Sequence, residues 1–257
     1  MNQSEKRTYL IKRLLNEKPE YADMNIPTNS VEQRTMLRSL MNIRMPGKID
    51  DEFLKIQDEY LKQVNEEKDI VTIDQLEPVK KDIYLWQGDI IRLRVGAIVN
   101  AANSGMTGCY QPCHNCIDNC IHTYAGVQLR YYCSEIMEKQ GFEEPTGSAK
   151  ITPAFNLPSR YIIHTVGPIV LGNLKKNQET QLKSCYELYL KIAEENNVDS
   201  IAFCCISTGV FGFPNDRAAE IAVDTVMKYK EKTHSKIKVL FNVFKEEDKR
   251  LYEKILE

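Results

Sequence analysis

The chain has 257 residues, which is enough for one large domain or for one domain with an extension. Hydrophobic residues make up 42% and charged residues 27%, and the net charge of -2 lacks the basic excess of proteins that bind nucleic acid or anionic membranes. No apolar run is long enough to span a bilayer, and the first residues lack the apolar core of a signal peptide. We therefore expect a cytoplasmic globular protein that binds neither nucleic acid nor membranes.

The first 70 residues predict a set of charged helices. Apolar side chains recur at helical spacing in three stretches, which are residues 9–15, 36–41 and 53–64. Prolines separate these stretches. No pattern in this segment indicates chemistry, and both packing against a main domain and a role facing the substrate stay open for it. We expect about three helices that form an N-terminal helical extension over residues 1–70, packed against a main domain over residues 71–257.

From about Asp69 onward, strand-like runs alternate with helix-like ones. The predicted strands are residues 82–87, 95–99, 149–154, 161–165, 200–207 and 236–244. The predicted helices are residues 117–140, 179–196, 215–230 and 246–256. Such alternation is typical of an α/β fold with a mostly parallel sheet and helices on both faces. In such folds, ligands bind beyond the carboxyl ends of the strands.

Two loops at predicted strand ends have the composition of a ligand site. Asn100–Asn103 opens the first loop, directly after an apolar strand. Ser207–Phe213 forms the second loop, with two glycines and two hydroxyl residues between a strand and a helix. Glycine lets backbone N–H groups approach an anion, and a helix N-terminus favours phosphate. The second loop also suits a tight turn without a ligand, and both interpretations stay open.

A cluster of soft metal ligands follows the first loop. Four of the eight cysteines lie between Cys109 and Cys120, and such clustering in a cytosolic chain favours a metal or catalytic site over disulfides. The spacing of Cys109, His114 and Cys116 lets two thiolates and an imidazole reach one tetrahedral zinc ion, with a fourth position open as in catalytic sites. Either Cys113 or Cys120 is an alternative fourth ligand that would make the site structural. A cluster of free cysteines without metal is the remaining interpretation.

Three further polar residues have a structural interpretation beside a functional one. Asp89 follows a predicted strand, where a carboxylate can accept a hydrogen bond from an exocyclic amine or can form a turn. His122 lies on a predicted helix and His164 at the end of a buried strand. We expect both histidines to be hydrogen-bonded structural side chains rather than metal ligands.

Five short stretches, spread over roughly residues 80–245, carry a resemblance to a known family. They are Gly88-Asp89-Ile90, Ala97-Ile98-Val99-Asn100-Ala101-Ala102-Asn103, Cys116-Ile117-Asp118-Asn119-Cys120-Ile121-His122, Tyr161-Ile162-Ile163-His164-Thr165-Val166-Gly167-Pro168 and Ser207-Thr208-Gly209-Val210-Phe211-Gly212-Phe213-Pro214. In this order they resemble the macrodomain family, which binds ADP-ribose. The resemblance implies a three-layer α/β/α fold with a mixed, mostly parallel central sheet.

The resemblance also implies roles for individual residues. Asp89 should accept a hydrogen bond from the adenine amine beside the backbone of Ile90, and Asn103 should contact the distal ribose. Phe244 should stack on adenine, and Asp118 matches an acidic residue that positions water in some macrodomains. The residues that should cradle the diphosphate are Ser207, Thr208, Gly209, Val210, Phe211 and Gly212.

The cysteine-rich loop departs from the common macrodomain pattern. Many macrodomain hydrolases have a run of glycines where this chain has residues 108–116. That replacement resembles the zinc-containing macrodomains of certain bacteria and fungi. The resemblance implies one zinc ion per chain, held by Cys109, His114 and Cys116, and a catalytic centre formed by these ligands with Asn103 and Asp118.

The resemblance to the zinc-containing group implies an activity. It is the removal of mono-ADP-ribose from aspartate and glutamate side chains, in reversal of a sirtuin-type ADP-ribosyltransferase. In several bacterial members the modified partner is a lipoylated relative of the glycine-cleavage carrier protein. Alternatives are an ADP-ribose-binding module without catalysis and a deacetylase acting on O-acetyl-ADP-ribose. We expect the protein to act as a monomer.

Overall fold

The computed structural model describes residues 1–21 and 23–257. Its α-helices are α1 (Gln3–Leu15), α2 (Ser30–Ile43), α3 (Asp51–Glu66), α4 (Ile117–Ala125), α5 (Val127–Gln140), α6 (Lys176–Glu195), α7 (Asn215–Thr233) and α8 (Glu246–Leu256). Its strands are β1 (Val71–Thr72), β2 (Ile83–Gln87), β3 (Leu93–Arg94), β4 (Ala97–Ala101), β5 (Ala149–Pro153), β6 (Tyr161–Thr165), β7 (Ser200–Phe203) and β8 (Lys238–Val243). None of the helices in this part of the chain combines the length and apolarity needed to cross a membrane.

A six-stranded sheet in the order β2-β8-β7-β4-β6-β5 forms the centre of the fold. Every neighbouring pair is parallel except β5 and β6. Strands β7 and β4 are buried along almost their whole length, which explains why their sequences are nearly continuous apolar runs. The short strands β1 and β3 form a separate parallel pair. The prediction of a mixed, mostly parallel sheet is confirmed.

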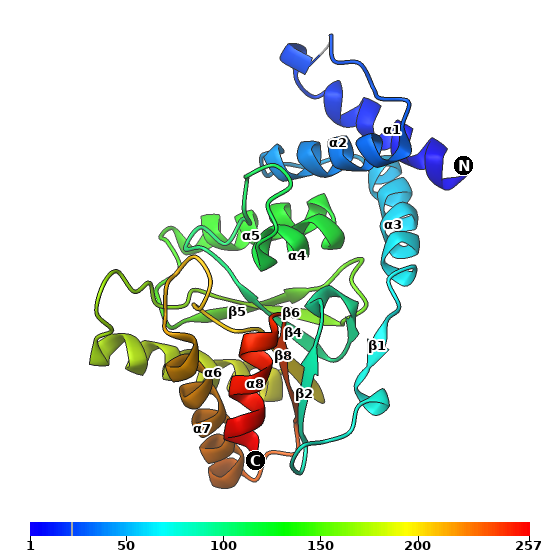
Figure 1. Ribbon diagram of the computed structural model, residues 1–257. Helices are drawn as coiled ribbons and strands as arrows, with labels where there is room; N and C mark the ends of the chain where they lie inside the picture. Colours follow the sequence, from blue (N-terminus) through cyan, green and yellow to red (C-terminus); the bar gives the residue numbers. More distant parts are fainter. Residues whose placement is uncertain (22) are drawn as a thin grey trace.

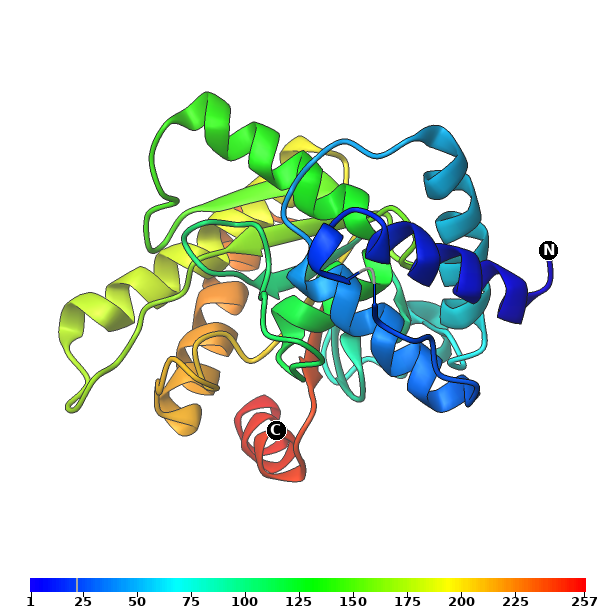
Figure 2. The ribbon, with the colours of Figure 1, turned by 90° about the horizontal axis from the view of Figure 1, so that it is seen from above.

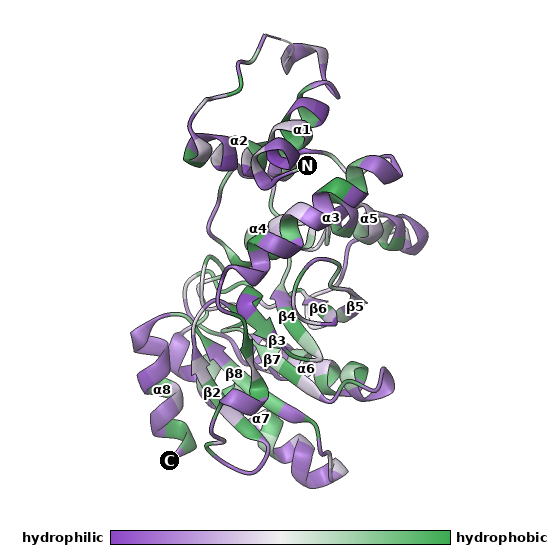
Figure 3. Cartoon of the chain, turned by 90° about the vertical axis from the view of Figure 1, so that its right-hand side faces the viewer, coloured by the Kyte–Doolittle hydropathy of each residue, from purple (hydrophilic) through white to green (hydrophobic). Residues whose placement is uncertain are grey.

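Helices cover both faces of this sheet, which gives the predicted three layers. Helices α4 and α5 lie on one side, and α6, α7 and α8 lie on the other (Figure 1). Aromatic rings fix part of the second interface, because Phe203 of β7 contacts Tyr186 and Tyr189 of α6. Figure 3 shows hydrophobic residues along the central strands and hydrophilic residues on the outer helices. The core of the sheet therefore forms as the sequence pattern predicts.

Helices α1, α2 and α3 stand together at one end of the molecule, next to α4 and α5 (Figures 1 and 2). They have a hydrophobic cluster of their own, in which Leu10, Leu37 and Phe53 are buried. Val127 of α5 also joins this cluster. The expectation of about three helices is met. The domain boundary at residue 70 stays a prediction.

The prediction of one helix over residues 117–140 is wrong, because the structure has two. Gly126, with φ of +102°, lies between α4 and α5. An added Cβ at Gly126 would lie 2.5 Å from Gln128 Oε1 and 2.7 Å from Gln57 Nε2. Glycine therefore permits both the left-handed backbone and the close approach of α3. The periodicity of apolar residues does not register such a break.

Strands β7 and β4 differ most from their predicted boundaries. Strand β7 ends at Phe203 rather than Ser207, because the chain turns early toward the second loop. Strand β4 runs from Ala97 to Ala101, two residues later than predicted. Both shifts leave the two candidate loops at the same edge of the sheet, since β4 and β7 are parallel neighbours.

Candidate functional site

Asn103 lies at the point where the chain leaves β4, and it connects two parts of the site. Ala102 N–H still bonds to the Thr165 carbonyl at 2.8 Å, which continues the pairing of β4 with β6. The exposed Asn103 side chain then donates to the Gly108 carbonyl at 3.2 Å and to Asp118 Oδ2 at 3.5 Å. The end of a rigid strand therefore holds Asn103 beside both the cysteine-rich loop and α4.

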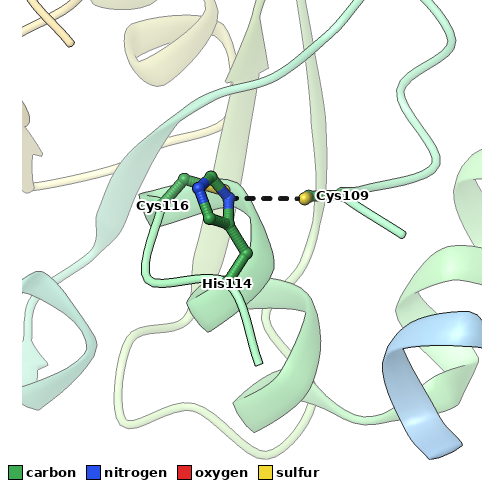
Figure 4. A group of neighbouring side chains, drawn as sticks. All are labelled: Cys109, His114 and Cys116. Atoms are coloured by element: carbon green, nitrogen blue, oxygen red, sulfur yellow. Dashed lines mark hydrogen bonds between the residues drawn. The ribbon is translucent and has the colours of Figure 1, made fainter. Parts of the chain in front are cut away.

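Residues 108–116, here called the metal loop, bring three soft ligands together (Figure 4). The ligand atoms of Cys109, His114 and Cys116 all lie within 4.8 Å of one another. Cys109 Sγ and His114 Nδ1 are 3.6 Å apart. Zinc bonds of about 2.3 Å to sulfur and about 2.0–2.1 Å to nitrogen, at a tetrahedral angle, separate such donors by about 3.6 Å. The donor set and this distance fit a zinc ion.

Cys116 occupies a special place because it is the N-cap of α4. Its sulfur accepts a hydrogen bond from the Asn119 N–H at 3.4 Å. The helix dipole favours a thiolate there. Burial acts in the opposite direction and raises the pKa of the Cys116 thiol to about 12. A bound cation would therefore be the main stabiliser of the thiolate form.

Cys113, within the loop, and Cys120, just after it, point away from the three candidate ligands. Cys113, with φ of +53°, places its sulfur 3.2 Å from Ser39 Oγ and 3.5 Å from the Thr35 carbonyl. Cys120 Sγ lies 3.6 Å from Arg38 Nη2. Both sulfurs face α2 and lie outside the Cys109–His114–Cys116 group. This arrangement favours a site with three protein ligands over a closed site with four.

A buried polar network lies beneath the metal loop. Asn100 Nδ2 lies 2.8 Å from Asp118 Oδ1 and 3.1 Å from His164 Nδ1. Burial raises the pKa of Asp118 to about 6 and lowers that of His164 to about 3. His164 Nε2 is 2.9 Å from Thr152 Oγ1, so the ring is hydrogen-bonded, and its structural role stays a prediction. His122 is also buried, but neither of its ring nitrogens has a hydrogen-bond partner among the described residues.

The second loop, residues 207–212, is closed by its own backbone. Phe213 N–H bonds to the Ser207 carbonyl at 3.0 Å, and Gly212 N–H bonds to the Gly209 carbonyl at 3.1 Å. Ser207 (φ +66°) and Gly212 (φ +68°) both adopt left-handed backbone conformations. The loop leads into α7 at Asn215, so it lies at a helix N-terminus as predicted. Its middle is open to solvent, and Val210 is 86% exposed.

The residues predicted to bind adenine lie at the far side of the same sheet edge. Gly88 N–H bonds to the Val243 carbonyl at 2.9 Å, so the chain segments that follow β2 and β8 stay together. Asp89 is half-buried and accepts a hydrogen bond from the Ile91 N–H at 3.2 Å, which is the turn-forming role considered above. Ile90 is buried, and Phe244 is 72% exposed. The structure thus brings Asp89 and Phe244 to neighbouring strand ends.

Known proteins match the chain in both sequence and fold. The Macro domain family matches residues 99–222. A protein-ADP-ribose hydrolase of Treponema medium is 56% identical over 260 residues, with 100% of both chains covered. A protein-ADP-ribose hydrolase of Staphylococcus aureus (strain MSSA476) is 47% identical, over 95% of this chain and 92% of its own. The chain belongs to the Macro domain family.

A solved macrodomain structure supports the fold assignment independently. The Trypanosoma brucei macrodomain in complex with ADP-ribose has a TM-score of 0.67 and 29% identity, over 86% of this chain and 95% of its own. The predictions of a macrodomain and of its α/β architecture are therefore confirmed. Membership of a zinc-containing group and the roles of individual site residues stay predictions.

Sequence reasoning missed three cationic residues around the macrodomain site. Arg38 of α2 and Arg130 of α5 both donate to backbone carbonyls of the metal loop. Lys68, just after α3, lies 3.1 Å from the centroid of the Tyr124 ring. Burial lowers the pKa of Lys68 to about 8, an effect that the charge of Asp89 partly offsets. No local pattern marks these residues, because their partners lie far away in the sequence.

Proposed function

We propose that this macrodomain is a zinc-dependent hydrolase that removes mono-ADP-ribose from acidic side chains of a protein. The observation that carries the proposal is that the side chains of Cys109, His114 and Cys116 come together, with Cys109 Sγ 3.6 Å from His114 Nδ1. This group lies beside Asn103 and Asp118. The names of the bacterial relatives, protein-ADP-ribose hydrolase, support the reaction type. The resemblance to zinc-containing macrodomains supports the acidic acceptor side chain.

In this proposal, ADP-ribose lies along the carboxyl edge of the sheet. Its adenine lies near Asp89, Ile90 and Phe244, and its distal ribose lies near Asn103. The residues proposed to surround the diphosphate are Ser207, Thr208, Gly209, Val210, Phe211 and Gly212. The N–H groups of residues 208–211 make no backbone hydrogen bond within the part of the chain that the structure describes, and together with the N-terminus of α7 they suit an anion. Solvated Phe244 offers a face on which adenine can stack.

The reaction adds water across the bond between the ribose and the carboxyl group of the modified side chain. Cys109, His114 and Cys116 would hold zinc, which supplies Lewis acidity when bound. Asn103 orients the distal ribose, since its amide is fixed by Gly108 and Asp118. Asp118, with a pKa of about 6, can accept a proton from the attacking water near neutral pH and return it to the departing oxygen, whether water attacks the anomeric or the acyl carbon. Asn100 keeps the Asp118 carboxylate in place.

We also propose a partner for this activity by resemblance. The modified protein is a lipoylated relative of the glycine-cleavage carrier protein, and a sirtuin-type ADP-ribosyltransferase places the ADP-ribose. The exposed middle of the loop over residues 207–212 is compatible with a macromolecular substrate.

The test is the release of ADP-ribose from an aspartyl-ADP-ribosylated protein. It compares wild type, His114→Ala and chelator-treated enzyme, with ADP-ribose affinity measured by calorimetry in each case. We expect kcat to fall about 10³-fold without zinc or His114, because metal Lewis acidity supplies several kcal/mol. ADP-ribose affinity should change only a few-fold.

Three other results would contradict parts of the proposal. Full activity of the chelated enzyme would remove zinc from the mechanism. Tight ADP-ribose binding without release by the zinc-loaded wild type would show a binding module. Faster turnover of O-acetyl-ADP-ribose than of modified protein would show a deacetylase.

A further inference from the structure

The metal loop contributes little to its own conformation. The His114 N–H bond to the Gln111 carbonyl, at 3.3 Å, is the one backbone hydrogen bond within residues 108–116, all of which the structure describes. Fixing a backbone residue costs roughly 1–2 kcal/mol of conformational entropy, so a loop of this kind needs outside contacts to keep one shape. Most of those contacts come from α2 and from the residues packed on it.

Arg38 of α2 makes the central contact. Its Nη2 donates to the His114 carbonyl at 2.7 Å and to Asn119 Oδ1 at 3.0 Å. Asn119 in turn donates from Nδ2 to the Gln111 carbonyl at 2.9 Å, and its N–H donates to Cys116 Sγ. One guanidinium therefore fixes the backbone of one metal ligand directly, and it fixes a second ligand through Asn119. Hydrogen bonds from a charged donor are stronger than those from a neutral one.

Asn42, one turn after Arg38 on the same helix, holds the middle of the loop. Its Oδ1 accepts from the Cys113 N–H at 2.9 Å, and its Nδ2 donates to Thr123 Oγ1 of α4 at 2.8 Å. The Asn42 side chain is buried, with 1% exposure. The left-handed Cys113 residue is thus fixed to α2 by its N–H as well as by its sulfur.

Arg130 of α5 connects the end of α2 to the third ligand. Its Nη1 donates to the carbonyls of Asn42 at 2.5 Å and Arg44 at 2.7 Å, and its Nη2 donates to the Cys109 carbonyl at 3.2 Å. The guanidinium also lies 4.2 Å from the centroid of the Tyr110 ring. All three residues of the ligand group are therefore connected to α2 by at most one intervening side chain.

We infer that α2 is part of the metal centre, and that Arg38 and Asn42 are positioning residues that hold the metal loop in its ligand geometry. Helix α2, which belongs to the N-terminal helical extension, then contributes to zinc affinity. This inference rests on the zinc site of the proposed function. A plain packing role for α2 would scatter its side-chain contacts along α4 and α5. The contacts of Arg38 and the bond that Asn42 accepts from Cys113 instead fall on residues 113–120, and one further bond joins Asn42 to Thr123.

The experiment measures zinc affinity, by competition with a chromophoric chelator, in full-length protein. The variants are Arg38→Ala, Arg38→Lys and the matched control Arg34→Ala, which removes an exposed arginine one turn earlier on α2. We expect Arg38→Ala to weaken zinc binding about 10- to 100-fold, the range found when supporting hydrogen bonds around a metal are removed. Arg38→Lys, which keeps a charged donor on a shorter side chain, should fall between. Arg34→Ala should match wild type.

Hydrogen exchange of the zinc-free proteins gives a second readout that does not depend on metal. The Cys113 amide should exchange faster in Arg38→Ala than in Arg34→Ala, while amides of β4 and β6 keep their protection. Equal zinc affinity and equal Cys113 exchange in Arg38→Ala and Arg34→Ala would overturn the inference alone. A wild type that takes up no zinc would overturn both the zinc in the proposed function and this inference. If Arg38→Ala does not fold, the zinc affinity and the Cys113 exchange of Arg38→Lys are compared with those of Arg34→Ala instead.

Discussion

The metal loop and the loop over residues 207–212 lie at the same edge of one sheet, but they are held in different ways. The second loop closes through its own backbone, with hydrogen bonds from Gly212 and Phe213 back to Gly209 and Ser207. The metal loop has one such bond and relies on side chains from α2 and α5. One outside bond, from the Val170 N–H to the Phe211 carbonyl at 2.8 Å, also reaches the second loop. The second loop therefore depends mainly on its own sequence, whereas the metal loop depends on residues far away in the chain. The metal loop should therefore be the more vulnerable of the two.

Among substitutions that leave the proposed ligands in place, the largest effect should come from Gly108→Ala, at the start of the metal loop. Gly108 has φ of +83°, and an added Cβ would lie 2.7 Å from Cγ of the buried His122 ring. That ring is enclosed, so the loop has to move instead. We expect zinc affinity to fall roughly 10- to 100-fold, with a matching loss of turnover, while ADP-ribose affinity changes less. Chelator competition and calorimetry measure the two affinities.

Gly141→Ala is the matched control for this variant. Gly141 has φ of +77° and no atom within 4 Å of an added Cβ, so it carries the backbone strain without the collision. Unchanged zinc affinity in both variants would show that the metal loop tolerates displacement, and the comparison of the two loops would then fail.

Gly212→Ala should act on the other loop and leave zinc binding intact. Gly212 has φ of +68°, and an added Cβ would lie 2.9 Å from the Val170 carbonyl oxygen. The left-handed backbone alone costs a non-glycine residue about 1–2 kcal/mol. If the loop relaxes away from its binding shape to avoid this cost, the ADP-ribose Kd should rise roughly five- to thirtyfold. Gly172→Ala (φ +85°, open space) controls for strain alone. A loss of zinc in Gly212→Ala would show that the two loops are not independent.

The last effect concerns the network beneath the metal loop and appears in acid. His164 has a native pKa of about 3 because it is buried, whereas an unfolded histidine titrates near about 6.5. Between these values the unfolded state binds more protons, so the histidine lowers stability as the pH falls, by at most about 1.4 kcal/mol per pH unit. Asp118, whose pKa is raised to about 6 by burial, acts in the opposite direction between that value and its unfolded pKa.

His164→Gln should therefore lose less stability than wild type between pH 6 and pH 4, as measured by urea unfolding at each pH. His234→Gln, which replaces an exposed histidine, should follow the wild-type curve. Parallel curves for wild type and His164→Gln would mean that His164 is charged in the folded protein, and the buried network would need another explanation.

The order of elements could be predicted from the sequence because it depends on local apolar patterns. The strand over residues 161–165 and the helix over residues 246–256 begin and end in the structure at the residues that the sequence pattern predicts. The ligand group could also be proposed, since Cys109, His114 and Cys116 lie within eight residues of one another. Local spacing carries information of this kind directly.

The supports of the site could not be predicted, because they depend on three-dimensional packing. Arg38 and His114 are 76 positions apart, and the residues around Arg38 form an ordinary charged helix. Spacing alone leaves Cys113 and Cys120 as further candidates for the metal, and only the direction of their side chains toward α2 separates them from the three proposed ligands. The break at Gly126 depends on the approach of Gln57 from another helix.

The attachment of the metal loop to α2 has a consequence for protein engineering. A graft of residues 108–116 into a macrodomain without a counterpart of α2 would transfer all three proposed ligands. It would not transfer Arg38, which donates to the His114 carbonyl and to Asn119 Oδ1. Such a graft should bind zinc weakly, because the ion would have to order the loop as it binds. A transplant that carries residues 30–43 together with the loop would keep the proposed ligands and the side chains of α2 that hold them in one unit.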